Sequence, residues 1–195
     1  MKLRQDLVQI ASWIDREVRL LDLGCGDGAL LAHLRDSHRC TGYGIEIDDA
    51  SVLACVRADV SVVQADLESG LRMFADAMFD TVVLSQTLQA MHNTASVLGE
   101  MLRVGREGIV SFPNFGYWRN RLQVLAGHMP VSPDLPFAWH DTPNVHLCTL
   151  QDFEGLCTTL GARVDERQVL TRGAPVTRLP NLLGSVALYR VSRRA

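Results

Sequence analysis

The sequence predicts an α/β fold in three layers, with a seven-stranded, mostly parallel sheet that ends in an antiparallel hairpin. Short apolar runs alternate with amphipathic helical patterns through most of the chain, as they do in the crossover units of a parallel sheet. The last two apolar runs, 163–170 and 185–191, have no convincing helix between them. Strands joined without a crossover helix pair antiparallel, so these two runs predict the hairpin.

The chain opens with a predicted helix, a strand and a glycine turn. Apolar residues at three- and four-residue spacing between Leu3 and Ile14 predict an amphipathic helix. The apolar run 18–23 predicts the first strand, and Gly-Cys-Gly-Asp-Gly follows it at 24–28. Helical spacing resumes at Ala29, so the order is strand, glycine turn and helix.

The same alternation continues through the middle of the chain. We expect strands at 43–47, 60–65 and 79–85, with helices at 50–58 and 96–104. The run 79–85 is unusually apolar, which is typical of a central strand that is buried on both faces of a parallel sheet.

The last third contains one long irregular segment. A fifth strand is predicted at 108–112 and a helix at 117–126, and the final helix spans 150–160. Four prolines fall between 127 and 145. Loops of this length in compact domains are usually functional, so we expect a lid or interface segment over about 115–147.

Composition indicates one domain, 1–195, of an ordinary globular protein. The net charge is -3 and the arginines are scattered, so no basic patch for nucleic acid stands out, and no apolar stretch is long enough for a membrane span. Five cysteines without a Cys-x-x-Cys pair favour a reducing compartment. With no signal-peptide pattern at the N-terminus, we expect a cytoplasmic protein.

The glycine turn predicts a nucleotide-type cofactor site. Gly24, Gly26 and Gly28 lack the Cβ that would block a tight turn or the close approach of a ligand. The spacing also fits the looser nicotinamide dinucleotide pattern. Asp22 and Asp27, however, would repel a pyrophosphate, whereas they attract the ammonium and sulfonium of S-adenosylmethionine.

Two later carboxylates extend the predicted site. Glu46, at the end of the second strand, can accept hydrogen bonds from both ribose hydroxyls, and Asp66 can accept one from the adenine amino group. Ile47 and Leu67 can flank the adenine ring. The predicted cofactor residues are Asp22, Gly24, Cys25, Gly26, Gly28, Glu46, Ile47, Asp66, Leu67, Ser85 and Gln86.

The segment 21–28 resembles the first motif of class I methyltransferases, which have a Rossmann-like fold. Longer strings at 83–89, 103–106, 108–116 and 141–149 make the chain similar to the MetW family of methionine biosynthesis proteins. The resemblance implies binding of S-adenosylmethionine or S-adenosylhomocysteine, and a role as partner or activator of homoserine O-acyltransferase. An active methyltransferase on a small metabolite stays open as the alternative, and a nicotinamide-dependent oxidoreductase is a weaker third hypothesis.

Candidate catalytic residues follow the fourth and fifth strands. Gln86 and His92 come after the fourth strand, Tyr117 comes after the fifth, and His140 and His146 lie in the irregular segment. A histidine in a loop is more often a surface group than a base, so these candidates are weak ones. The histidines and cysteines do not have the spacing of metal ligands, and we expect no metal site.

Overall fold

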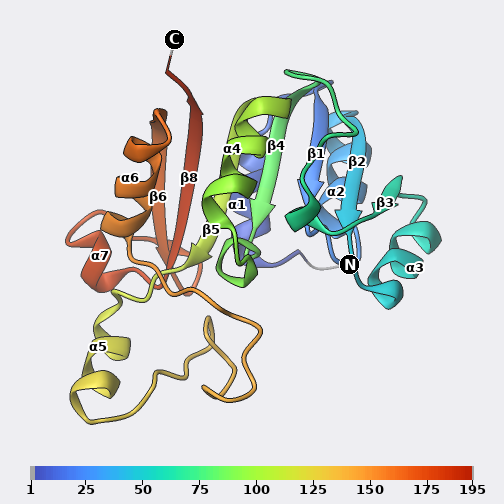
Figure 1. Ribbon diagram of the computed structural model, residues 1–195. Helices are drawn as coiled ribbons and strands as arrows, with labels where there is room; N and C mark the ends of the chain where they lie inside the picture. Colours follow the sequence, from blue (N-terminus) through green and yellow to red (C-terminus); the bar gives the residue numbers. More distant parts are fainter. Residues whose placement is uncertain (1–2, 195) are drawn as a thin grey trace.

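The computed structural model describes residues 3–194 and contains an eight-stranded sheet between two layers of helices (Figure 1). Residues 1, 2 and 195 of the predicted 1–195 domain lie outside the described residues. The strands, in chain order, are β1 (Arg19–Leu23), β2 (Thr41–Glu46), β3 (Val62–Gln64), β4 (Phe79–Ser85), β5 (Gly105–Pro113), β6 (Ala162–Thr171), β7 (Ala174–Pro175) and β8 (Val186–Arg193).

The sheet is mostly parallel, with antiparallel pairing at the end that β8, β6 and β7 form. The order is β3-β2-β1-β4-β5-β8-β6-β7. The strands from β3 to β5 pair in parallel, and β8 pairs antiparallel with both β5 and β6. The predicted fold class, including the antiparallel terminal hairpin, is confirmed.

The structure differs from the prediction in small elements. The strand that the sequence did not predict is β7, which has only two residues and pairs with the end of β6. A four-residue helix, α7 (Pro180–Leu183), lies between the hairpin strands where no helix was expected. Two 3₁₀ turns, η1 (Leu67–Ser69) and η2 (Leu88–Ala90), follow β3 and β4. Elements this short contain too few residues to show a hydrophobic period.

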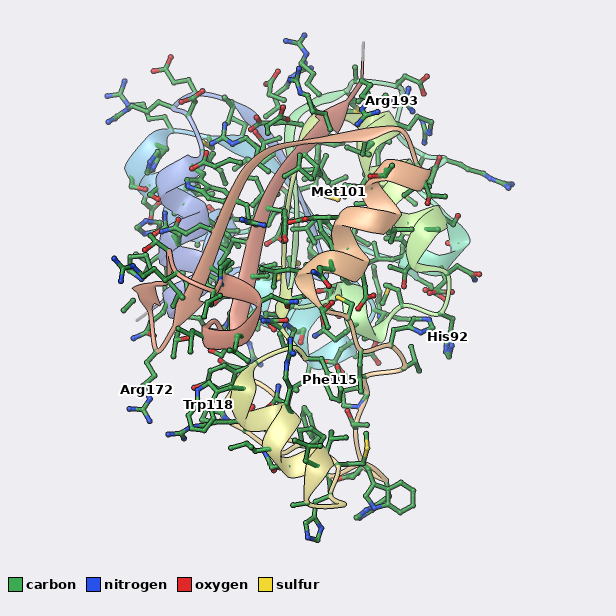
Figure 2. All side chains as sticks on the ribbon, turned by 90° about the vertical axis from the view of Figure 1, so that its left-hand side faces the viewer. His92, Met101, Phe115, Trp118, Arg172 and Arg193 are labelled. Atoms are coloured by element: carbon green, nitrogen blue, oxygen red, sulfur yellow. The ribbon has the colours of Figure 1, made fainter. Side chains whose placement is uncertain are left out.

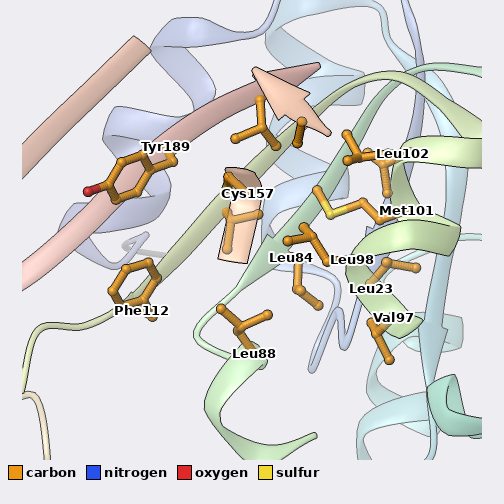
Figure 3. Close-up of a cluster of buried hydrophobic side chains, with 14 of the residues drawn as sticks. Leu23, Leu84, Leu88, Val97, Leu98, Met101, Leu102, Phe112, Cys157 and Tyr189 are labelled. Carbon is orange, nitrogen blue, oxygen red and sulfur yellow. The ribbon is translucent and has the colours of Figure 1, made fainter. Parts of the chain in front are cut away.

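The helices cover both faces of the sheet. One buried cluster joins the strands to the first three helices, and a second joins them to α4 and α6. In the second cluster Leu98 and Met101 of α4 lie near Leu23 and Leu84 of the strands (Figure 3). The helices are α1 (Gln5–Trp13), α2 (Ala29–His38), α3 (Asp49–Arg57), α4 (Thr94–Val104), α5 (Trp118–Leu125) and α6 (Leu150–Thr159).

The fifth helix does not belong to either layer. In Figure 1, α5 and the irregular chain after it, 126–149, extend below the sheet. Asn120 is the one buried residue of α5, and its amide donates to the backbone oxygen of Asn114 at 3.3 Å. The described residues contain no helix long and apolar enough to cross a membrane.

Candidate functional site

The predicted cofactor residues gather at the carboxyl edge of the sheet because β1 lies between β2 and β4. In the register of these strands, Asp22 is opposite Gly44 of β2 and Val83 of β4. The turn 24–28 therefore leaves the sheet beside the ends of both neighbouring strands. Its first two backbone amides, those of Gly24 and Cys25, donate to the carbonyl of Ile45 at 2.8 and 3.1 Å.

Gly24 and Gly26 require glycine for different structural reasons. Gly24 has a φ of +71°, and a Cβ there would lie 2.6 Å from Oγ1 of Thr87, so this position is filled by the chain itself. Gly26 has a φ of +55°, but a Cβ there would meet nothing within 4 Å. A glycine whose free side faces open space is suited to the close approach of a ligand.

Asp22 is a buried carboxyl that forms no ion pair with any cationic side chain of residues 3–194. Its side chain is 4% exposed. Burial raises its pKa to about 7, the positive charge of Arg4 opposes this rise, and the negative charge of Glu46 adds to it. A carboxyl in this state loses its proton readily when a cation is placed beside it.

Glu46 connects the end of β2 to the glycine turn. Its Oε2 accepts from the Gly26 amide at 2.9 Å, and its Oε1 accepts from the amides of Ile47 and Asp48 at 2.8 and 3.0 Å. Both carboxylate oxygens are thus already engaged with the backbone. Sequence reasoning missed this role, in which Glu46 fixes the turn to the second strand.

The remaining predicted cofactor residues have unlike environments. Asp66 is exposed and caps η1 by accepting from the Glu68 amide at 2.9 Å. Ile47 is 62% exposed, whereas Leu67 is buried in the hydrophobic core. Cys25 is buried under the turn, and burial raises the pKa of its thiol far above the usual value, which is typical of a packing residue.

Ser85 belongs to a buried polar network that the sequence did not indicate. Its hydroxyl accepts from Nη2 of Arg4 at 2.8 Å and contacts Oδ2 of Asp6 at 3.2 Å and the hydroxyl of Ser111 at 3.1 Å. Asp6 is buried and forms an ion pair with Arg4 at 3.1 Å. The network fixes the start of α1 to the ends of β4 and β5. Only the apolar positions of α1 are periodic, so nothing in the sequence indicated that its polar residues form this network.

A cavity of about 890 Å³ lies beside the predicted cofactor site. Gln86 and Tyr117 line it, and so do Arg4 and Asp6 from the network. Gln86 has a φ of +56°, a strained conformation for a residue other than glycine. Its backbone N–H donates to the backbone carbonyl of Ser111 at 2.9 Å. Strain of this kind concentrates at functional sites.

The three histidine candidates do not join that cavity. His92 and His146 line a second cavity, of about 570 Å³, and Nε2 of His146 lies 3.2 Å from the carbonyl oxygen of His92. His140 is exposed, and its ring forms a T-shaped contact with the ring of Trp139. Figure 2 shows His92 well away from Trp118 and Arg172. Among residues 3–194, no three His, Cys, Asp or Glu side chains are grouped as a metal site requires.

The fold is that of the S-adenosylmethionine-dependent methyltransferases. One solved structure, from Archaeoglobus fulgidus, has a TM-score of 0.69 at 15% identity and covers 97% of this chain and 95% of its own. A TehB-like methyltransferase from Corynebacterium glutamicum has a TM-score of 0.65 at 14% identity, and the match covers 99% of this chain and 89% of that enzyme. The cyclase SpnF has the same fold, with a TM-score of 0.69 at 19% identity, and the match covers 98% of this chain and 80% of SpnF.

The chain belongs to the MetW family. The model of this family, described as methionine biosynthesis protein MetW, matches residues 4–191. The chain is also 43% identical over 157 residues to a bifunctional methionine biosynthesis protein MetXA/MetW from Rhodopirellula baltica. The match covers 75% of this chain and 25% of that protein, so the chain spans about a quarter of this relative.

Proposed function

We propose that the chain binds S-adenosylmethionine or S-adenosylhomocysteine at the glycine turn. The observation that carries this is the buried Asp22 carboxyl, which is not ion-paired within the described part of the chain, beside the open side of Gly26. The ligand ammonium lies near Asp22, the ribose hydroxyls near Glu46 and the adenine amino group near Asp66. Nicotinamide dinucleotides are disfavoured because their pyrophosphate would lie against Asp22 and Asp27.

The second part of the proposal is that the chain acts as a partner or activator of homoserine O-acyltransferase. The support is the Rhodopirellula baltica relative, a bifunctional methionine biosynthesis protein MetXA/MetW, in which a MetW part is joined to a MetXA part. The family resemblance implies that the MetXA part is the acyltransferase. Linking two proteins in one chain keeps their contact at a high effective concentration. Separate chains of the same two families then need a surface of their own for association.

That surface is the exposed face of α5. Trp118, Leu122 and Leu125 are spaced so that they lie on one side of the helix. Leu122 is 53% exposed and Leu125 is 82% exposed. Trp139, in the irregular segment that follows, is 73% exposed. Aromatic and aliphatic side chains gathered on a projecting element are typical of the centre of a protein interface.

The cysteines support a location in the cytoplasm. All five are free, including Cys25 and Cys55, whose sulfur atoms lie 3.7 Å apart. Thiols of this kind stay reduced in a reducing compartment such as the cytoplasm.

A methyltransferase acting on a small metabolite is the second candidate function. The observation that favours it is the 890 Å³ cavity, which Gln86 and Tyr117 line beside the cofactor site. An acceptor bound there would lie close to the methyl group. Fold alone does not decide between the two candidates, because one fold supports several chemistries.

One assay separates the two functions. Homoserine O-acyltransferase from the same organism is assayed with and without an equimolar amount of this protein, together with methyl-labelled S-adenosylmethionine. The proposal expects acyltransferase activity to rise or last longer with the protein present, while no label moves. An unchanged acyltransferase activity refutes the partner role, and label found in a small molecule establishes the methyltransferase instead.

A further inference from the structure

The large cavity carries charges that the proposed function does not use. Three arginines and two aspartates line it. Arg4 is neutralised by Asp6, with Nη2 and Oδ2 3.1 Å apart. Arg119 and Arg172 form no ion pair with any carboxylate of the described residues 3–194, although the whole chain has a net charge of -3. Within the described part of the chain, the cavity wall therefore keeps two guanidinium groups that no carboxylate neutralises.

Arg119 and Arg172 each lie on a well-defined element of the fold. Arg119 is in the first turn of α5, and its Cζ lies 5.3 Å from the centre of the Trp118 ring, a cation–π contact. Arg172 is in the turn between β6 and β7, with a φ of +51°. Figure 2 shows Arg172 and Trp118 on the same side of the molecule. A guanidinium fork matches a carboxylate in shape and charge.

Part of the cavity lining is apolar. Val131 and Phe137 line it, and they are 50% and 46% exposed. Pro133, Pro136 and Pro143 also line it, and prolines offer no backbone N–H to a ligand. The volume falls in the range of small-molecule sites.

We propose that this cavity binds a small-molecule carboxylate with an apolar body. Arg119 and Arg172 hold the carboxylate, and Val131 and Phe137 contact the body. A phosphate is a poorer fit, because Asp134 is also in the wall and repels a second negative charge. Gln86, with its strained backbone, also lines the cavity. This site goes beyond the adenosyl site and needs neither that ligand nor the acyltransferase.

The test uses hexanoate as the probe and hexanamide as its uncharged counterpart. Binding to the full chain is followed by saturation-transfer NMR, which detects millimolar affinities. We expect hexanoate to bind at least tenfold more tightly than hexanamide. Equal affinities, or no detectable binding of hexanoate, would overturn the proposal. Displacement of hexanoate by an equal concentration of inorganic phosphate would also overturn it, because the site would then be a phosphate site.

Variants assign the binding to these residues. The double change Arg119→Gln and Arg172→Gln is expected to reduce hexanoate affinity at least tenfold and to leave hexanamide unchanged. Arg178→Gln is the matched control, because Arg178 is also exposed and does not line the cavity. Phe137→Ala should weaken both probes equally. Unchanged hexanoate binding in the double variant contradicts the proposal. Adenosyl-ligand binding, measured separately on the same samples, shows whether the cofactor proposal stands or fails on its own.

Discussion

At the scale of single residues, Asp22 is the group on which the cofactor proposal most depends. Burial holds its pKa at about 7, so its charge changes near neutral pH. The proton is bound below this pKa and released above it. A cationic ligand binds the ionised form, so cofactor affinity follows the ionisation of Asp22.

The affinity for S-adenosylmethionine is therefore expected to rise with pH. Between pH 6 and pH 7.5 the ionised fraction of Asp22 increases severalfold, and the affinity should increase by roughly the same factor, up to about tenfold. Asp22→Asn should bind weakly and show no such rise. Calorimetric titration across this pH range checks the prediction. Equal pH dependence in the wild type and in Asp22→Asn would show that another group controls binding.

At the scale of elements, α1 is held at the site edge by its polar residues as well as by its apolar face. Asp6 accepts from Nε and Nη2 of Arg4, both at 3.1 Å, and contacts the hydroxyls of Ser85 and Ser111. Removing a buried acceptor leaves its donors without a partner.

Asp6→Asn should lower the free energy of unfolding by about 1 to 3 kcal/mol, because the ion pair and the hydroxyl contacts are disrupted. Asp15→Asn, at an exposed aspartate just after α1, is the control and should change it by less than about 0.5 kcal/mol. Urea denaturation followed by circular dichroism measures both. Equal stability of the two variants would mean that the network contributes little to the attachment of α1.

The exposed face of α5 leads to a separate prediction about the partner. Leu122→Glu together with Leu125→Glu should weaken the complex with homoserine O-acyltransferase at least tenfold, since buried apolar contacts at an interface are replaced by charges. Binding of the adenosyl ligand should not change. Val8→Glu, at a residue of α1 that is 56% exposed, is the matched control. Pull-down or calorimetry measures the complex, and a double variant that binds as tightly as Val8→Glu argues for another surface.

At the scale of the whole molecule, the sequence predicted what depends on local pattern. The glycine turn, the carboxylates near the ends of β1 and β2 and the absence of a helix pattern before β8 were enough for the fold. These features have strong signals because glycine and periodic apolar residues have few structural alternatives.

What the sequence could not predict depends on contacts between distant segments. Ser85 meets Arg4, which is 81 residues away along the chain, and no periodic pattern relates the two. Likewise the large cavity is lined by the start of α1, the end of β4, α5 and the turn after β6. The irregular segment 126–149 has no period from which its position could be predicted. Such sites become visible only in the folded chain.

The most direct test of the central claim compares Gly26→Arg with Gly161→Arg. Both glycines have positive φ values, +55° and +66°, and a Cβ at either meets nothing within 4 Å, so the two changes cost similar backbone strain, about 1 to 2 kcal/mol. Only Gly26 lies in the turn that we assign to the adenosyl ligand. Calorimetric titration with S-adenosylhomocysteine should show wild-type affinity for Gly161→Arg and at least a tenfold loss for Gly26→Arg. Equal affinities in the two variants would contradict the account and place the ligand elsewhere.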